Sequence, residues 1–322
     1  MRRIAAFVFA VLLALPVAAQ EIYPSRPITI ISPYAPGGAS DFLARTLAEA
    51  LRARLHQPVI VQNVPGAGGA VGSVQASKAK PDGYTLLLNH VGLSTIPSLY
   101  KKLAFDPLAS FEPIGLFAEA PMVMLARKDF QPNTFAELVA YAKANKEKLT
   151  FASSGMGSAT HLCAMLFQEA IGTPLTMVQY KGAGPALLDI RSGQVDVICD
   201  LPTTTSGAIR SGELKAFVLT APRRMASLPD VPTAAEVGMP SLDISTWFGL
   251  YAPLGTPKPI IETLSKALRD IVVDKGVAQQ LEKIETDLFT ADKATPEALR
   301  TKLSSQIDLW RPIIEKAGIQ AE

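Results

Sequence analysis

Short apolar runs alternate with longer segments of helical periodicity along most of the chain. Leu43, Leu47, Leu51 and Leu55 recur every four residues, the spacing of one buried helix face. The apolar runs predict strands at Ile28–Ser32, Val59–Gln62, Thr85–Leu88, Ile114–Phe117, Met122–Ala126, Thr150–Ala152, Met177–Gln179, Val195–Cys199, Ala216–Thr220 and Gly249–Ala252. The periodic segments predict helices at Asp41–Leu55, Phe135–Asn145, Ala159–Ile171, Pro185–Ser192, Ile260–Asp274 and Pro296–Glu315. This alternation predicts an α/β fold with a mostly parallel sheet.

The N-terminal residues follow a different pattern. Arg2 and Arg3 precede an apolar run from Ile4 to Leu15, and the small residues Val17–Ala19 come after it. This is the pattern of a secretory signal peptide, and the run is shorter than the about 20 residues that span a bilayer. We expect residues 1–19 to be removed, and the mature chain to be exported and soluble because no later segment is apolar enough to cross a membrane.

The remaining length of roughly 300 residues exceeds what one compact core usually holds, so two lobes are expected. Extended segments at Ala120–Arg127 and Trp247–Pro257 would suit a hinge of two crossing strands. The first lobe would then comprise residues 20–121 and 248–322, and the second lobe residues 122–247.

The charge balance and the cysteine content exclude some classes of function and structure. Without Arg2 and Arg3 the chain has 29 basic residues, which equals its 29 acidic residues. This balance, with no basic cluster, argues against nucleic acid as a partner. The two cysteines, Cys163 and Cys199, do not make a disulfide framework in a chain of this length. Buried free thiols are the favoured interpretation, although export permits a disulfide.

Three loops share one design, a glycine turn between a strand and a helix. They are residues 33–41 (PYAPGGASD), 153–161 (SSGMGSATH) and 180–189 (YKGAGPALLD). The first turn of a helix has unpaired N–H donors and roughly half a positive charge, so such loops bind anions. The alternative is that Ser40, Asp41 and Ser158 are plain helix caps. Three such loops in one exported chain favour a ligand site at the carboxyl ends of the strands.

Other motifs indicate binding rather than catalysis. The glycines at Gly66, Gly68 and Gly72 do not have the spacing of a dinucleotide fingerprint, so they predict an anion-facing or lobe-packing turn. The chain has no G-x-S-x-G elbow, and its three histidines are not at metal-ligand spacing. A Ser158–His161 dyad is conceivable, but capping and packing explain both residues. We therefore predict no catalytic group, metal or cofactor.

The strands, turns and helices together resemble the Bug family of periplasmic solute receptors, which serve tripartite tricarboxylate transporters. The resemblance spans nearly the whole mature chain. It rests on residues 23–41 (YPSRPITIISPYAPGGASD), 63–72 (NVPGAGGAVG), 80–88 (KPDGYTLLL), 151–162 (FASSGMGSATHL), 180–196 (YKGAGPALLDIRSGQVD), 228–238 (LPDVPTAAEVG) and 247–257 (WFGLYAPLGTP).

The resemblance implies a two-lobed periplasmic-binding-protein fold of the Venus-flytrap type, with two crossing hinge strands. It implies a periplasmic monomer that binds a small carboxylate between its lobes and delivers it to membrane subunits of the transporter. The ligand-binding residues that it implies are Pro36, Gly37, Gly38, Ala39, Ser40, Asp41, Ser154, Gly157, Ser158, Thr160, Lys181, Gly182 and Asp200.

Three aromatic side chains bear on the identity of the ligand. Tyr34, His90 and Trp247 could line the cleft, where they would suit an aromatic, phthalate-like acid through stacking as well as an aliphatic acid. An aliphatic di- or tricarboxylate is the favoured ligand class, and the aromatic acid is the alternative. His90, if protonated, could pair with a second carboxylate. Two further functions stay open: a carboxylate sensor with a signalling partner, and a hydrolase with Ser158 or Ser40 as nucleophile.

Overall fold

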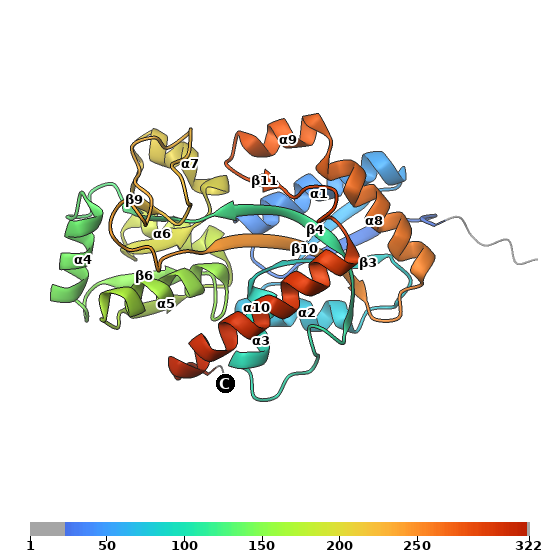
Figure 1. Ribbon diagram of the computed structural model, residues 1–322, viewed down its shortest axis with the longest axis horizontal. Coiled ribbons are helices and arrows are strands. Elements are labelled where there is room, and N and C mark those ends of the chain that lie inside the picture. The colour runs from blue at the N-terminus through green and yellow to red at the C-terminus, as the bar shows by residue number, and fades with distance from the viewer. Residues whose placement is uncertain (1–22, 321–322) are drawn as a thin grey trace, which may run out of the picture.

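The computed structural model describes residues 23–320, so the predicted signal peptide, residues 1–19, lies outside the described residues. Its strands form two separate sheets (Figure 1). The first sheet contains β1 (Ile28–Ser32), β2 (Val59–Asn63), β3 (Thr85–His90), β4 (Phe111–Pro121), β10 (Ser245–Pro253) and β11 (Asp287–Leu288). The second contains β5 (Val123–Arg127), β6 (Thr150–Ser153), β7 (Thr176–Gln179), β8 (Val197–Asp200) and β9 (Leu214–Leu219). The strand orders are β11-β4-β10-β3-β1-β2 and β7-β6-β8-β5-β9.

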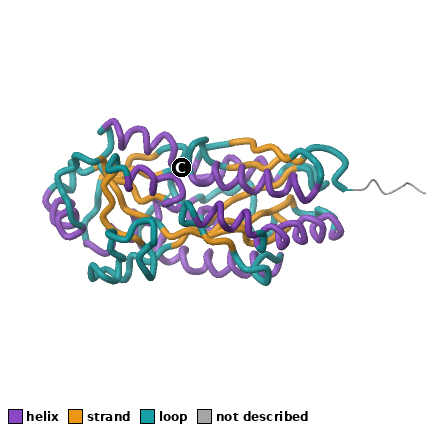
Figure 2. Tube along the Cα trace, turned by 90° about the horizontal axis from the view of Figure 1, so that it is seen from above, coloured by secondary structure: helices purple, strands orange, loops and turns teal. Residues whose placement is uncertain are grey.

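Helices surround both sheets, as the two perpendicular views show (Figures 1 and 2). Against the first sheet lie α1 (Ala39–Leu55), α2 (Ala70–Ser77), α3 (Gly92–Leu99), α8 (Lys258–Val272), α9 (Lys275–Glu282) and α10 (Pro296–Lys316). Against the second lie α4 (Phe135–Ala144), α5 (Ala159–Ile171), α6 (Ala183–Ser192) and α7 (Pro202–Arg210). Leu43, Leu47 and Leu51 are fully buried, so the apolar face of α1 is the one that its periodicity predicted. None of the helices within residues 23–320 has the length and apolarity needed to cross a bilayer.

The sheets are mixed, so the expectation of a mostly parallel sheet was wrong. Each sheet has two parallel pairings, β1 with β2 and β3, and β6 with β7 and β8. The other five pairings among the described strands are antiparallel, and all of them involve β4, β5 or β10. These are the strands that connect the two sheets, and a chain that crosses and returns must run in opposite directions.

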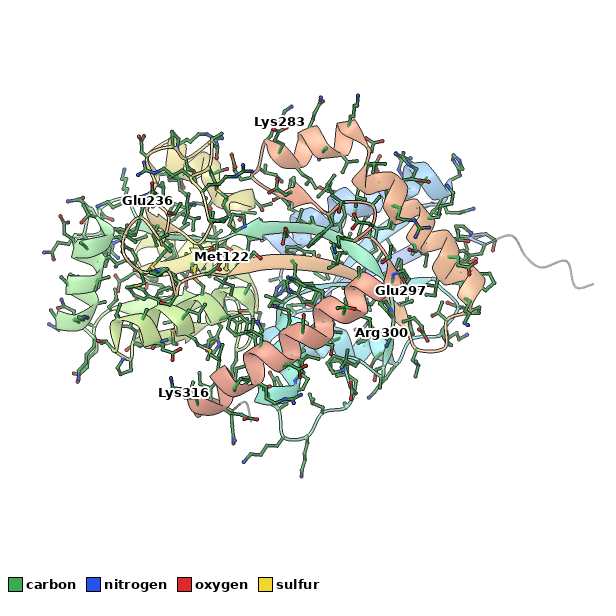
Figure 3. All side chains as sticks on the ribbon, in the orientation of Figure 1. Met122, Glu236, Lys283, Glu297, Arg300 and Lys316 are labelled. Atoms are coloured by element: carbon green, nitrogen blue, oxygen red, sulfur yellow. A yellow bond between two sulfur atoms is a disulfide. The ribbon has the colours of Figure 1, made fainter. Side chains whose placement is uncertain are left out.

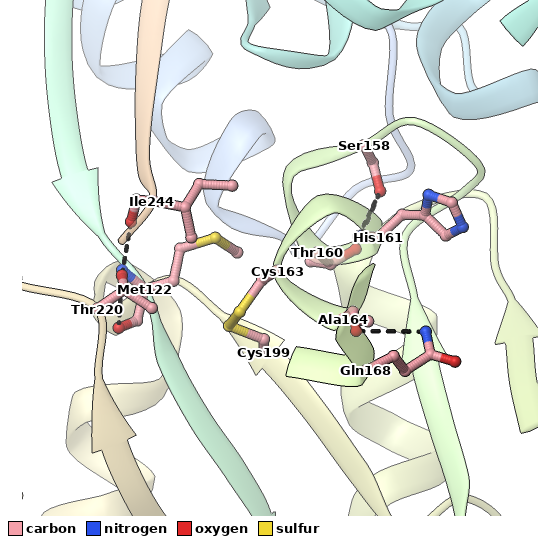
Figure 4. Close-up of a disulfide and its surroundings, with 10 residues drawn as sticks. All are labelled: Met122, Ser158, Thr160, His161, Cys163, Ala164, Gln168, Cys199, Thr220 and Ile244. Carbon is pink, nitrogen blue, oxygen red and sulfur yellow. Dashed lines mark hydrogen bonds between the residues drawn. A yellow bond between two sulfur atoms is a disulfide. The ribbon is translucent and has the colours of Figure 1, made fainter. Parts of the chain in front are cut away.

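The connecting strands are longer than the sequence predicted. β4 and β10 pair from Phe111 and Pro253 to Pro121 and Ser245. β4 then continues through Met122 into β5 of the other sheet, and Figure 3 places Met122 between the two halves. The Thr220 hydroxyl accepts a hydrogen bond from the Met122 amide (2.8 Å) and donates one to the Ile244 carbonyl (2.6 Å) (Figure 4). Thr220 thus holds the two crossing segments together.

Four helices, α2, α3, α7 and α9, have no counterpart among the predicted ones. Each has eight or nine residues, which is too short for a clear helical repeat. α3 also contains Pro97 and begins at Gly92, two residues that weaken a helix prediction. Their packing against the sheets, rather than their propensity, stabilises them.

Cys163 and Cys199 form a disulfide, so the preference for free thiols was wrong. Helix α5 packs on β8, which brings the two Cα atoms to 6.1 Å, within bonding range. Sequence separation could not reveal this proximity, because it depends on how α5 crosses the sheet.

Candidate functional site

A small cavity lies where the two halves of the molecule meet. Its volume of about 20 Å³ corresponds to about one water molecule. Both halves contribute to its lining, which consists of Tyr34, Gly38, Ala39, Ser40, His90, Ser154, Ala159, Thr160, Ala183, Asp200 and Leu201. No lysine or arginine belongs to this lining.

The wall from the first half is the N-terminus of α1, where the turn after β1 ends. Its N-cap residue, Gly38, has no side chain to accept a hydrogen bond, and the first amides, of Ala39 and Ser40, have no intrahelical acceptor. Both residues line the cavity. The uncapped amides and the helix dipole make this wall attractive to a negative charge.

Asp41 lies behind this wall and does not line the cavity. Its carboxylate accepts hydrogen bonds from the Gly37 amide (3.2 Å) and the Asn63 side chain (3.0 Å), and it forms an ion pair with Arg45 (2.9 Å). Burial alone would raise the pKa of Asp41, but these donors outweigh it and lower the pKa. Asp41 is therefore ionised and fully engaged in holding the turn.

The wall from the second half is a network of hydroxyl groups at the start of α5. The Ser158 hydroxyl caps α5 by accepting the His161 amide, and it lies 3.0 Å from the Thr160 hydroxyl. The Thr160 hydroxyl accepts the Ser154 amide (2.6 Å) and lies 2.9 Å from the Ser154 hydroxyl. The disulfide from Cys163 to Cys199 ties this turn of α5 to the end of β8 (Figure 4).

A third turn, before α6, touches the first half directly. The Ala35 amide donates to the Lys181 carbonyl (3.0 Å). A Cβ atom on Gly182 would lie 2.7 Å from the Ala35 nitrogen, so only glycine permits this approach. Like Gly38, Gly182 gives its helix no side-chain cap, and Ala183 at the start of α6 lines the cavity.

The glycine turn of residues 63–73 also packs against the other half. A Cβ atom on Gly68 would lie 1.8 Å from the Met156 carbonyl oxygen. The Thr95 hydroxyl donates to the Gly157 carbonyl (2.8 Å) across the same boundary. The two halves are therefore in contact around the cavity, which is the geometry of a closed form.

Two aromatic side chains form one edge of the cavity. The rings of Tyr34 and His90 are stacked, with centroids 4.5 Å apart, and His90 meets Phe248 edge-on. Nδ1 of His90 accepts the Gly92 amide (2.9 Å), so the neutral ring has its proton on Nε2. Burial lowers the pKa of His90 to about 3, which disfavours near neutral pH the protonated form that pairing with a second carboxylate requires.

Asp200 is the last residue of β8 and also lines the cavity. The residue is 1% exposed, and its Oδ2 atom has no hydrogen-bond partner among the described residues. Burial raises the pKa of Asp200 to about 7, against the opposing effects of the Leu201 amide and the Thr204 hydroxyl.

The structure gathers half of the predicted ligand-binding residues at the cavity and places the others behind or beside it. Trp247 is buried on β10 and donates to Gln306 (3.3 Å), so the structure does not bring it to the cavity. The other residues outside the lining are Pro36, Gly37, Asp41, Gly157, Ser158, Lys181 and Gly182. Sequence reasoning missed Ala159 and Ala183, whose only signal is their position at or near the start of a predicted helix. Leu201, which also lines the cavity, follows the predicted strand Val195–Cys199.

The conceivable Ser158–His161 dyad is not formed. Ser158 accepts the backbone amide of His161, whereas Nδ1 of His161 accepts the Gly157 amide (3.2 Å). Burial lowers the pKa of His161 to about 4. The histidine therefore has a packing role, as the sequence favoured.

Comparisons with known proteins match nearly the whole chain to one family. The family model "Tripartite tricarboxylate transporter family receptor" matches residues 43–319. An Agrobacterium vitis protein, "UPF0065 protein in the TAR-I ttuE-ttuC' intergenic region", is 42% identical over 98% of this chain and 92% of its own length. Protein BugT of Bordetella pertussis is 36% identical over 95% of this chain and 93% of its own.

Solved structures give the same result. The periplasmic binding protein BugD superposes with a TM-score of 0.90 at 42% identity, covering 93% of this chain and all of its own. MatC from Rhodopseudomonas palustris, with bound malate, has a TM-score of 0.87 at 33% identity, covering 91% of this chain and 100% of its own. An R. palustris protein with adipate has a TM-score of 0.87 at 28% identity, covering 92% and 99%. The chain therefore belongs to the Bug family of tripartite tricarboxylate transporter receptors, which are periplasmic solute-binding proteins with a two-lobed α/β fold.

Proposed function

We propose that this receptor captures a small carboxylate in the cavity between its halves and delivers it to the membrane subunits of a tripartite tricarboxylate-type transporter. The observation that supports this proposal most directly is the pair of uncapped helix N-termini, α1 and α6, which reach one cavity from opposite halves. Neutral amide and hydroxyl donors bind a carboxylate strongly once the halves close and exclude water. The bound malate and adipate of two relatives fit the same chemistry.

The lobe boundary that we propose follows the sheets. It passes through Met122, between β4 and β5, and through the segment that joins Ile244 to β10. The Thr220 contacts to both segments make this the place where hinge bending would occur. Closure then depends on contacts that only the closed form makes.

The stacked pair of aromatic rings favours an aliphatic ligand. Tyr34 and His90 already stack on each other, and His90 also meets Phe248, so one face of each ring is used within the protein and not by a planar acid. We expect the cavity to enlarge for the ligand by a movement of the two halves about the hinge, with the Tyr34–His90 stack kept intact. We therefore favour an aliphatic dicarboxylate over a phthalate-like one.

The test is a thermal-shift screen of the purified receptor against mono-, di- and tricarboxylates, phthalate and neutral sugars, followed by uptake measurements on a deletion strain. Aliphatic dicarboxylates should raise the melting temperature most, and deletion should abolish uptake of the same compound. A shift with a neutral sugar and none with any carboxylate would refute the proposal. Binding without any loss of uptake would instead favour a sensor.

A further inference from the structure

Asp200 is a buried carboxyl group in a cavity whose other features attract anions. Its residue is 1% exposed, its Oδ2 atom has no hydrogen-bond partner among residues 23–320, and it shares the cavity with the helix starts at Ala39 and Ala183. The proposed function uses the helix starts but gives no role to this acid. A buried polar atom without a partner costs free energy, and a ligand group that pairs with it removes that cost.

The charges around the cavity determine whether Asp200 is protonated or ionised when a dianionic ligand is bound. The lining includes residues at the starts of four helices, α1 (Ala39), α5 (Ala159), α6 (Ala183) and α7 (Leu201). Each start offers about half a positive charge, so together they offset about two negative charges. A dianion beside an ionised Asp200 would bring three negative charges into a lining without lysine or arginine. Two carboxyl groups in one desolvated site avoid this repulsion by sharing a proton.

No other titratable group in the surroundings can take over this role. Tyr34 and His90 are the other titratable side chains of the lining, and Nδ1 of His90 is occupied by the Gly92 amide. The elements packed against β8 are β5, β6, α5 and α6, and their charged or titratable side chains have other partners. These are Arg127 with Asp129 and Asp196, His161 with the Gly157 amide, Glu169 with Lys316, Asp189 with Tyr180, and Arg191 with Glu213.

We propose that Asp200, in its protonated form, donates a hydrogen bond to a second carboxylate of the ligand, so that capture of a dicarboxylate takes up about one proton. This inference rests on the proposed function and specifies the ligand as a dicarboxylate with its second acid group at the end of β8. Burial of Asp200 favours the protonated form, in agreement with the upward shift of its pKa to about 7. The proton comes from solvent and returns to it when the ligand leaves.

Proton uptake has a definite sign in binding measurements. Above the pKa of Asp200 in the unliganded receptor, affinity for a dianion falls as pH rises, and it approaches a tenfold loss per pH unit. Titration calorimetry at about pH 8, in two buffers of different ionisation enthalpy, should show an uptake of about one proton per ligand. The probe is whichever of succinate, malate, glutarate and adipate binds most tightly.

Two experiments test whether the proton is taken up by Asp200: one compares variants with wild type, and the other compares two ligands. Asp200→Asn should bind the probe with an affinity that no longer changes with pH and without proton uptake. The matched control is Asp196→Asn, which should keep the wild-type pH dependence because Asp196 is paired with Arg127 and lies outside the cavity lining. The monoamide of the same probe, such as succinamate, should bind wild type without proton uptake, since it has no second carboxylate; this arm needs no variant to fold.

The outcomes separate this inference from the proposed function. Dicarboxylate binding without proton uptake, or an unchanged pH dependence in Asp200→Asn, would overturn the role of Asp200 and leave the receptor function intact. Tighter binding of a ligand with an amino group, without proton uptake, would also overturn it, because Asp200 would then be an ionised partner. Failure of every dicarboxylate to bind at about pH 6 as well as at about pH 8 would refute the receptor proposal itself.

Discussion

The two principal walls of the cavity are the N-termini of α1 and α5, and both follow a glycine turn. They differ in whether a side chain caps the helix. The α1 wall has Gly38 at the N-cap, which leaves the first amides open. The α5 wall has Ser158 at the N-cap, a buried hydroxyl network and a disulfide one turn later. One wall thus offers free donors, and the other offers donors whose positions are fixed by their neighbours. A glycine turn before a helix predicts a helix start but not which of these two roles it has.

The largest expected effect tests whether the α5 wall is the more firmly held one. Replacing both Cys163 and Cys199 by alanine removes a disulfide between two cysteines that lie 36 residues apart in the sequence. We expect the free energy of unfolding to fall by about 3–4 kcal/mol, measured by urea denaturation. Hydrogen exchange should locate the loss in α5 and β8 and leave α1 protected. Equal loss of protection in α1 and α5 would contradict the contrast between the walls.

The next effect concerns the contact between the halves. Gly68→Ala places a Cβ atom against the Met156 carbonyl, so it should block closure and reduce ligand affinity at least about 100-fold, or about 2.7 kcal/mol. Calorimetry with the dicarboxylate from the screen measures this loss.

A matched control exists for this substitution. Gly172→Ala introduces the same residue at a similar backbone conformation, with φ of 64° against 60° for Gly68, but into open space. It should reduce stability in the same way and leave affinity unchanged. If both variants bound equally well, contact at Gly68 would not be part of the ligand-bound form.

A smaller effect separates capping from binding at the α5 wall. Ser158→Ala removes the α5 cap and one member of the hydroxyl network, so it should cost about 1 kcal/mol of stability and also weaken ligand binding. Thr134→Ala removes an equivalent cap from α4, which does not contribute to the cavity lining. It should cost about the same stability without affecting affinity. Equal affinities of the two variants would show that Ser158 is only a cap.

The smallest effect is at the surface, where α10 of the first half reaches α5 of the second. Figure 3 shows Lys316 at the end of α10, and its ammonium lies 2.7 Å from the Glu169 carboxylate. Lys316→Ala should weaken ligand affinity by no more than about fivefold, and salt should remove the difference. Lys266→Ala, which breaks an ion pair within α8, is the control and should have no effect. An effect of equal size in both variants would exclude a role in closure.

Sequence reasoning was most successful where a signal is local. The apolar face of α1 and the glycine turns before α1, α5 and α6 follow from spacing and residue type, and the structure contains them. It was least successful for short helices and for strand ends. β4 extends to 11 residues because it pairs with β10, and no local pattern in either strand shows that pairing.

The sequence by itself determined the α/β class and, through motifs spread over nearly the whole chain, the family. It also located the helix starts that we propose to bind an anion. Only the tertiary structure decided which helix starts stay uncapped, that Cys163 meets Cys199, and that His90 is neutral. It also decided that Asp200 is buried deeply enough for the loss of solvent to favour its protonated form. The reason is physical: propensity and periodicity act between near neighbours in the chain, whereas burial and pKa depend on atoms brought together from distant segments.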